Sequence, residues 1–194
     1  MEIKYRFALD RNDNLVDVSE LNRIDLTKED KFYSIDFHNE LIPKLGDVMT
    51  KHFAHKGDSE GSQESYLHAL AKKVFSDEYL KCIADKEPFY LKYKVDNKCL
   101  RLDSLGVSCI HTEYKLFDLT SKFDQLFIEK RDGQFIPDVM LYNSINGDKI
   151  YIEIAVTHFC EDEKINSGNR IVEFSIQREE DISNILDFKV GKVD

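Results

Sequence analysis

The sequence contains no apolar run long enough to cross a bilayer, no internal repeat and no low-complexity tract. Its first residues, MEIKYRFALDRNDN, are charged from the start and lack the apolar segment of a secretory signal. With 42% hydrophobic and 33% charged residues over 194 positions, the chain has the balance of a globular protein of one domain, or one domain and a small appendage. We therefore expect a cytoplasmic protein with no membrane partner.

Paired cysteines are also missing. The chain has four cysteines, and none of them forms a CxxC pair: Cys82, Cys99, Cys109 and Cys160. This scatter favours reduced thiols, as in the cytoplasm, over a disulfide framework.

Positive charge is scarce, since 27 Lys and Arg face 37 Asp and Glu, for a formal net charge of -10. A protein whose whole surface grips nucleic acid is usually basic, so non-specific backbone binding is disfavoured as the main activity. A metal-dependent nuclease remains compatible with this charge, because its metal site is built from carboxylates. A protein partner that supplies positive surface is also compatible.

The first part of the chain has the pattern of short strands and turns. KYRFALD and LVDV flank the turn DRNDN, which predicts a hairpin, and KFYSID predicts a further strand. The polar stretch GDSEGSQ, residues 57–63, is the predicted linker. We therefore predict a small β-rich N-terminal module, residues 1–57, and a second domain, residues 58–194.

A helix is predicted from Glu64 onward. Apolar residues recur there with helical spacing, at Leu67, Leu70, Ala71, Val74 and Phe75. Ser62 is a suitable N-cap, and Glu64 falls in the first turn. Glu64 therefore lies at the end of a helix with one buried face.

The remainder alternates between strands and short helices. The segments 89–95, 98–102 and 106–114 are β-like, while 115–133 fits either a helix or a loop that enters a strand. EDEKINSGNR predicts a short helix, IVEFSI a final strand and EEDISNILDF a terminal helix. The predicted fold class is α+β with a mixed sheet.

The strongest local signal is a hairpin over residues 134–157. Asn146-Gly147 is a typical two-residue hairpin loop, and it would set Asp138 opposite Ala155 and Met140 opposite Glu153. Side chains alternate along strands, so Asp138 and Glu153 share one face as diagonal neighbours, with Cα atoms about 7–8 Å apart. The other face is apolar, with Val139, Leu141, Ile152, Ile154 and Val156.

Two carboxylates at this separation suit one divalent cation. Hard oxygen ligands favour Mg²⁺ or Mn²⁺, and without a cation the two charges repel each other. The alternative is that Asp138 and Glu153 are solvated residues on the wet face of an antiparallel hairpin.

The segment FIPDVMLYNSINGDKIYIEIAVTHF resembles the PD-(D/E)xK nucleases, and within them the competence-protein CoiA-like family. HFAHK, ESYLHALAK, KLFDLTSKFDQLFIEKRDGQFIPDV and IEIAVTH resemble that family in the same order and span about two-thirds of the chain. The resemblance implies an αβββαβ core with a mixed sheet. It assigns the acid of the first helix to Glu64, the PD acid to Asp138 and the (D/E) acid to Glu153.

The resemblance also picks out three further residues. His68 follows Glu64 by one helical turn, and Glu129 and Lys130 match a recurrent EK pair before the PD strand. A half-buried hydrogen-bonded histidine and an ordinary surface charge pair are the respective alternatives.

The sequence departs from the family where the motif lysine belongs, because position 155 is Ala155. That lysine orients water and neutralises developing charge, which a methyl group cannot do. Lys164, which follows the strand, is the candidate replacement for a catalytic role; the alternative is an ordinary helix-surface lysine.

A second departure concerns zinc. Relatives often carry two cysteines before the HFAH histidines, and this chain has Ser34 and Phe37 in those positions. His52 and His55 alone make a poor structural zinc site, even with His38 as a third ligand, and a set of Cys99, Cys109 and His111 is weaker still. We therefore predict that the N-terminal module folds without zinc.

Together these features predict a Mg²⁺- or Mn²⁺-dependent nuclease, acting on DNA in a defence or DNA-processing setting that only the resemblance suggests. Glu64, Asp138 and Glu153 would hold the ion, and Lys164 would assist catalysis. Two alternatives stay open: a catalytically inactive nuclease fold that acts as a nucleic-acid-binding or regulatory subunit, and an unrelated α+β interaction domain. A protein partner or a homo-oligomer also stays open.

Overall fold

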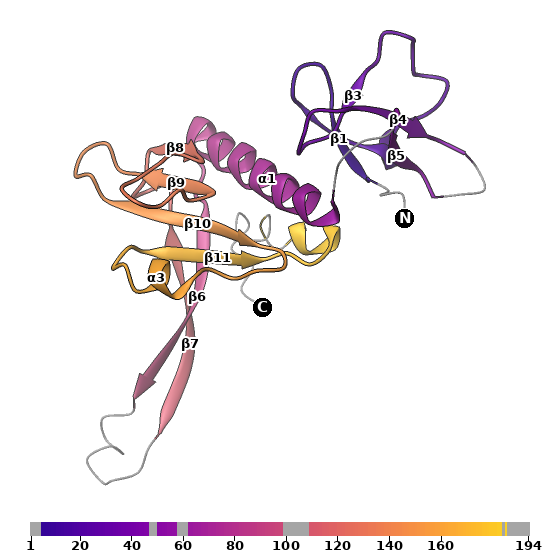
Figure 1. Cartoon of the computed structure of the whole chain (residues 1–194). Helices are drawn as coiled ribbons and strands as arrows, with labels where there is room; N and C mark the ends of the chain where they lie inside the picture. The colour runs from indigo at the N-terminus through magenta and orange to yellow at the C-terminus, as the bar shows by residue number, and fades with distance from the viewer. Residues whose placement is uncertain (1–4, 47–49, 58–61, 99–108, 184, 186–194) are drawn as a thin grey trace. The chain divides into compact units, whose positions relative to one another are not determined.

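The computed structural model describes residues 5–46, 50–57, 62–98, 109–183 and 185 (Figure 1). The chain divides into two compact units. The first contains residues 1–73, 154–159 and 175–179, and the second contains residues 74–153, 160–174 and 180–194. The chain is a mixed α+β protein, as the sequence predicts, with three separate sheets among the described residues.

The first unit is built on a five-stranded sheet of order β2-β1-β3-β4-β5. Its elements are β1 (Phe7–Leu9), β2 (Leu15–Asp17), β3 (Phe32–Tyr33), β4 (Glu40–Lys44) and β5 (His52–His55), with the 3₁₀ helix η1 (Val18–Glu20) after β2. The predicted first hairpin is confirmed, with Ala8 paired to Val16. Its turn is closed by Asp10, whose carboxylate accepts the N–H groups of Asn12 and Asn14.

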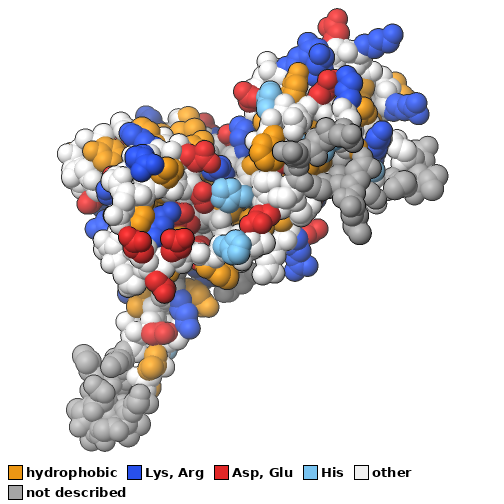
Figure 2. Space-filling model, viewed as in Figure 1, with side chains coloured by type: hydrophobic (Ala, Val, Ile, Leu, Met, Phe, Trp, Pro, Cys, Tyr) orange, Lys and Arg blue, Asp and Glu red, His pale blue; other side chains and the backbone are white. Residues whose placement is uncertain are grey.

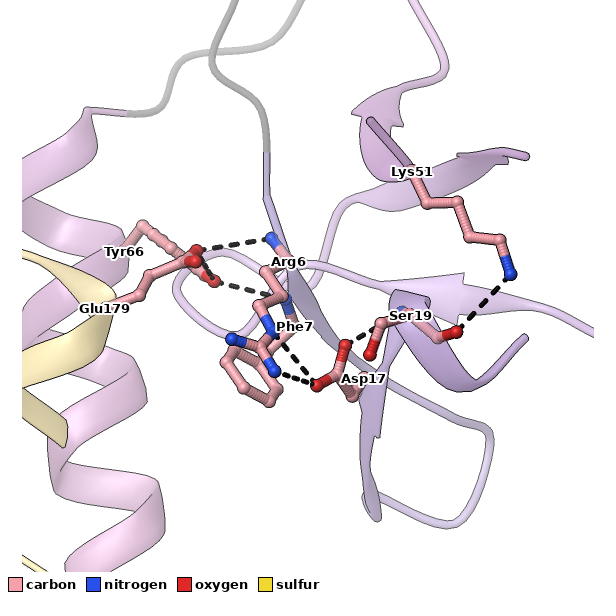
Figure 3. A network of polar contacts seen from close by, with 7 residues as sticks. All are labelled: Arg6, Phe7, Asp17, Ser19, Lys51, Tyr66 and Glu179. Atoms are coloured by element: carbon pink, nitrogen blue, oxygen red, sulfur yellow. Dashed lines mark hydrogen bonds and ion pairs between the residues drawn. The ribbon is translucent and has the colours of Figure 1, made fainter. Parts of the chain in front are cut away.

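A polar network joins three separate segments of this unit (Figure 3). The Tyr66 hydroxyl donates to Glu179 Oε1 at 2.6 Å and accepts the Phe7 backbone N–H at 3.2 Å. Arg6 donates its own N–H to the same glutamate and pairs with Asp17 at 2.6 Å. Because Tyr66 is fully buried, these bonds replace the water that its hydroxyl loses on folding.

Helix α1 (Gln63–Asp85) begins where the sequence predicts. Ser62 caps it, since its Oγ accepts the Ser65 N–H at 3.0 Å. The predicted apolar face is buried, and the helix continues beyond Phe75 with two further buried residues, Tyr79 and Cys82. Residues 99–102 of the predicted 98–102 strand, residues 58–61 of the linker, and positions 184 and 186–188 of the terminal helix lie outside the described residues.

The second unit is built around a four-stranded sheet of order β11-β10-β9-β8. The chain enters it from α1 through two strands of a separate ribbon, and runs in the order β8 (Gln125–Ile128), β9 (Val139–Tyr142), β10 (Lys149–Ala155), α3 (Asp162–Ile165), β11 (Ile171–Ser175) and η2 (Glu179–Ile182). β8, β9 and β10 form an antiparallel meander. β11 runs parallel to β10. Tyr151 N–H bonds to Arg170 O, and further along both strands in the same direction Ile176 N–H bonds to Ala155 O.

An aromatic cluster forms part of this unit's core. The Phe75 ring lies 5.3 Å from the Phe89 ring and 5.9 Å from the Phe174 ring, and Tyr79 packs 5.4 Å from Phe89. The buried Tyr79 hydroxyl donates to the Phe123 carbonyl at 2.8 Å. The helix is thereby fixed to the loop before β8.

The ribbon consists of β6 (Tyr90–Lys98) and β7 (Ile110–Asp118), paired antiparallel over their whole length. It extends away from the four-stranded sheet (Figure 1). β6 and β7 correspond to the predicted β-like segments 89–95 and 106–114. β7 also continues into the 115–133 stretch, which fitted either a helix or a loop from sequence.

The β9–β10 hairpin exists, but its predicted register is wrong. Tyr151 pairs with Met140 and Ile152 with Val139, so the strands are shifted by two residues and Asp138 is not opposite Ala155. The cause is a longer loop: Asn143 accepts the N–H groups of Ile145 and Asn146 on its side chain and closes the loop through Asp148. Gly147, at φ +77, ends this loop instead of forming a two-residue turn. A shift of two leaves every side chain on its predicted face.

No helix in the described part of the chain is long and apolar enough to cross a membrane.

Candidate functional site

Glu153 lies in the middle of the sheet and is only 8% exposed. Strand β10 is buried on both faces, since Tyr151 and Ala155 are as inaccessible as Ile152 and Ile154. The solvated-hairpin alternative is therefore wrong for Glu153. The carboxylate belongs to a buried polar site, and buried charges of this kind require partners.

Asp138 directly precedes β9. Val139 pairs with Ile152, so the next position along the two strands sets Asp138 opposite Glu153. Its backbone is fixed from the other side, where the Glu129 N–H donates to the Asp138 carbonyl at 3.0 Å. Glu129 has a left-handed backbone, φ +48, which a non-glycine residue adopts at a cost. Directly opposed residues are closer than the diagonal neighbours predicted from sequence, so the corrected register tightens the acidic pair.

Lys164, on α3, reaches this pair. Its Nζ lies 2.7 Å from Glu153 Oε1, and the side chains of the lysine and the glutamate are 16% and 10% exposed. Oε1 has no hydrogen bond of regular geometry, so the contact is an ion pair more than a directed hydrogen bond. The distance is what matters for charge neutralisation, and it shows that Lys164 is not an ordinary surface lysine.

Opposing effects act on the pKa of Glu153. Burial raises the pKa of Glu153, the neighbouring Asp138 and Glu173 carboxylates raise it further, and Lys164 lowers it in part. The net direction is upward. The site therefore favours the charged form less than water does, unless a further cation is bound.

Glu173 on β11 is a residue that the sequence analysis missed. The parallel register places it beside Glu153, on the same face. Its Oε1 accepts the Cys160 backbone N–H at 2.5 Å. Burial raises the pKa of the Cys160 thiol to about 12, and this carboxylate raises it too. A lone acid within the strand IVEFS was the available sequence signal.

A second polar group, formed by Asp132, Lys149 and Tyr151, lies on the same face of the sheet, nearer the start of β10. Asp132 accepts hydrogen bonds from Lys149 and, at 2.5 Å, from the Tyr151 hydroxyl. These bonds hold the pKa of Asp132 below its usual range. Asp132 belongs to the loop of residues 129–137. This loop also reaches α3, because Gln134 donates to Glu163 at 3.2 Å. The loop is thereby linked to α3, which carries Lys164 to Glu153.

Lys130, of the predicted EK pair, extends over the Phe127 ring, with Nζ 3.5 Å from the ring centroid. Phe127 pairs with Met140, so this cation lies over the sheet face that also carries Glu153.

Glu64 belongs to the first unit, where it lines a pocket of about 400 Å³. Thr157 donates its hydroxyl to Glu64 Oε1. The pocket is also lined by Ser62, Ser65, His68, Ile154, Val156 and His158. His68 and His158 thus share a cavity with Glu64, and the role of Glu64 in the same site as Asp138 and Glu153 stays a prediction.

The residues of the second unit fit a divalent ion by their donor chemistry. Asp138 and Glu153 supply hard carboxylate oxygens, and Glu153 Oε1 is buried with no regular hydrogen bond. Within the described ranges, no three His, Cys, Asp or Glu side chains are grouped closely enough to form a complete ligand set. In Figure 2, acidic, basic and histidine side chains are interleaved on the face shown.

The residues compared with zinc ligands in the N-terminal module form hydrogen bonds within the protein. His52 and His55 lie three residues apart on β5, which directs them to opposite faces of the strand. His55 Nε2 bonds to the Tyr5 hydroxyl at 2.7 Å, and His52 Nδ1 lies 2.9 Å from the Thr50 carbonyl. The buried Ser34 accepts the Asn39 N–H on its hydroxyl at 3.1 Å.

His38 lies next to Ser34, because the His38 N–H donates to the Ser34 carbonyl at 3.1 Å. Phe37 is 57% exposed, and His38 stacks on Tyr33 with ring centroids 4.4 Å apart. Cys99, from the alternative set with Cys109 and His111, lies outside the described residues.

Comparison with protein-family models, with curated proteins and with solved structures finds no match to this chain.

Proposed function

We propose that the chain is a Mg²⁺- or Mn²⁺-dependent nuclease that hydrolyses phosphodiester bonds, DNA being the expected substrate. Asp138 and Glu153 would hold the ion, Lys164 would assist the reaction, and Glu64 of the first helix is the third ligand that the resemblance implies. The observation that carries this proposal is the Lys164–Glu153 contact at 2.7 Å beside Asp138. It unites the residues that the sequence resemblance singled out with the lysine that it lacked.

The order of elements supports the proposal. Helix α1, the meander β8–β10, helix α3 and the parallel strand β11 follow one another as an αβββαβ core would, with the β6–β7 ribbon inserted after the first helix. The PD and (D/E) acids fall on neighbouring strands of the meander, at the same level. This is the arrangement that the PD-(D/E)xK resemblance implies.

Lys164 supplies from α3 what Ala155 lacks. A lysine ammonium near the acidic pair orients the attacking water by hydrogen bonding and neutralises charge that develops on the phosphate oxygens. A divalent ion, when bound, lowers the pKa of its water and polarises the phosphoryl group. Glu153 and Asp138 orient these groups, and their own negative charge is what makes the face selective for a cation.

Hydrolysis balances without another reactant. One water oxygen bonds to phosphorus, the bond from phosphorus to a sugar oxygen breaks, and the two water protons end on the leaving oxygen and on solvent base. No oxidant or second substrate is needed, which fits a site with carboxylates and a lysine only.

The test is cleavage of single- and double-stranded DNA and of RNA by the purified chain with Mg²⁺ or Mn²⁺. Wild type should cut at least one substrate, whereas Asp138→Asn and Glu153→Gln should not. Lys149→Ala is the matched control, because Lys149 lies on the same strand but pairs with Asp132. Equal cleavage by wild type and Asp138→Asn would refute the proposal.

A second candidate is a nuclease fold without catalysis that binds or regulates. Two observations favour it: Ala155 removes the motif lysine, and Lys164 neutralises Glu153 without any metal. Binding of nucleic acid by wild type and by Asp138→Asn with equal affinity, and no cleavage with any metal, would decide for this candidate.

A further inference from the structure

The β6–β7 ribbon has an edge that no other strand covers. Among the described residues it forms a sheet of two strands only, so the outer edges of both β6 and β7 are unpaired. An isolated two-stranded ribbon is marginally stable, and an open edge is a template for another strand.

The exposed residues of β7 are unusually apolar for such a strand. Ile110 is 60% exposed, Tyr114 63% and Leu116 41%. In Figure 2, hydrophobic and charged side chains lie together along the ribbon. Apolar residues spaced by two lie on one face, so these three form a single exposed stripe.

The hydrogen-bond parity of the ribbon shows which backbone groups face outward. Leu119 N–H bonds to Phe89 O, so this pair is of the hydrogen-bonded kind, and the pairs alternate from there. Tyr93–Lys115 and Val95–Glu113 are then hydrogen-bonded across the ribbon. The N–H and C=O groups of Thr112, Tyr114 and Leu116 consequently point to the open edge.

We propose that β7 pairs antiparallel with β7 of a second copy of this chain, about a twofold axis at Tyr114. In this register Tyr114 faces its symmetry mate as a hydrogen-bonded pair, and Thr112 faces Leu116. The outward backbone groups are the ones that this pairing uses. The result is a continuous four-stranded sheet across two copies.

Charge complementarity selects this register. Glu113 of one copy lies directly opposite Lys115 of the other, twice per dimer, in the closer non-hydrogen-bonded kind of pair. Within one chain these residues already form an ion pair at 3.0 Å. The dimer would thus carry a cluster of four alternating charges on one face and the Tyr114–Leu116 stripe on the other.

The edge of β6 fits a second copy less well. A twofold axis at Lys94 sets that lysine against itself. An axis at Val95 opposes Lys94 to Asp96, but it also opposes Lys92 to Lys98, so its attraction is offset. Like charges directly opposite destabilise a strand pair.

The test is the mass of the full chain in solution, measured by sedimentation over a range of concentrations. Wild type should dimerise. Glu113→Lys alone and Lys115→Glu alone should each weaken the dimer roughly 10- to 100-fold, because attraction becomes repulsion twice. An equal mixture of these two single variants should dimerise again, since each lysine then meets a glutamate of the other copy.

The mixture separates the dimer from a role inside one chain. Each single variant keeps its own like-charged pair at 113 and 115, so mixing restores nothing within a chain. Lys94→Glu, on the other edge, is the control and should dimerise as wild type does. A monomeric wild type at all concentrations, or a mixture that stays monomeric, would overturn the proposal, whether or not the chain cuts nucleic acid.

Discussion

The two units treat their polar residues in opposite ways. In the first unit, the groups at the positions compared with zinc ligands have protein partners: Ser34 Oγ with Asn39, His55 Nε2 with Tyr5 and His52 with Thr50, while His55 Nδ1 is buried without a hydrogen bond. In the second unit, Glu153 is buried near two other carboxylates, and one lysine offsets this charge. A hydrogen-bonded polar group is accounted for by the fold, whereas a concentration of buried like charge marks a candidate functional site.

The largest effect that sharpens this contrast is on catalysis. Lys164→Ala should lower the cleavage rate about 10²- to 10³-fold, because assistance by a positioned cation is typically of this size. Metal binding should persist, since both carboxylates remain. Single-turnover cleavage at saturating Mn²⁺ measures the rate.

The same variant should also lose stability. Because the ion pair is largely buried, loss of the lysine also destabilises the fold, by roughly 1–3 kcal/mol for an unpaired buried group. Rates must therefore be compared at a temperature where both proteins are folded. Wild-type cleavage by Lys164→Ala would remove this lysine from the mechanism.

The polar network around Tyr66 should affect stability alone. Tyr66→Phe removes the hydroxyl that joins Glu179 to the Phe7 N–H, and should lower the free energy of unfolding by about 1–3 kcal/mol. Denaturant unfolding measures the change. Cleavage per folded molecule should stay at the wild-type value. A large loss of rate would mean that the Tyr66 network also supports catalysis.

The pH dependence of stability should isolate Glu153. A carboxyl whose pKa is raised in the folded state stabilises the protein fully below its unfolded pKa, near 4.3, and this contribution is lost as pH rises through the folded value. Glu153→Gln cannot ionise. Its melting temperature should therefore gain on that of wild type as pH rises from about 4 to 8.

The comparison uses the change of the melting difference with pH. At low pH wild-type Glu153 is neutral too, so both proteins then lack the negative partner of Lys164 and that loss does not enter the change. Asp30→Asn is a suitable control, since that acid is exposed and hydrogen bonds to Thr27 lower its pKa. A melting difference between wild type and Glu153→Gln that is flat with pH would contradict the direction assigned to this group.

The smallest expected effect is that of zinc removal. Ser34, His55 and His52 form hydrogen bonds with Asn39, Tyr5 and Thr50. A strong chelator should therefore leave the unfolding of the N-terminal sheet unchanged. Elemental analysis should find far less than one zinc per chain. Stoichiometric zinc would contradict the contrast between the two units.

Local patterns predicted the elements and faces well. Period-two alternation gave the correct faces of β9 and β10, and the Ser62 cap and the spacing from Leu67 gave the start of α1. The register failed because Asn143 competes with Asn146-Gly147 for control of the loop, and single-sequence patterns do not weigh one against the other.

The site was only partly visible in the sequence. Lys164 could be proposed because it closely follows the strand of Glu153. The burial of Glu153 could not, because it depends on tertiary packing, in which α3 carries Lys164 to Glu153 and is linked to the 129–137 loop through Gln134–Glu163. For the same reason the Asp132–Lys149–Tyr151 group and the position of Glu173 were missed.

The most direct test of the central claim is titration of Mn²⁺ by calorimetry into wild type and into the double variant Asp138→Asn, Glu153→Gln. The account predicts a saturable site in wild type and its loss in the double variant, with the exposed pair Asp25→Asn, Glu20→Gln as a charge-matched control that still binds. Equal binding by wild type and the Asp138→Asn, Glu153→Gln variant would contradict the claim that these two carboxylates form a metal site.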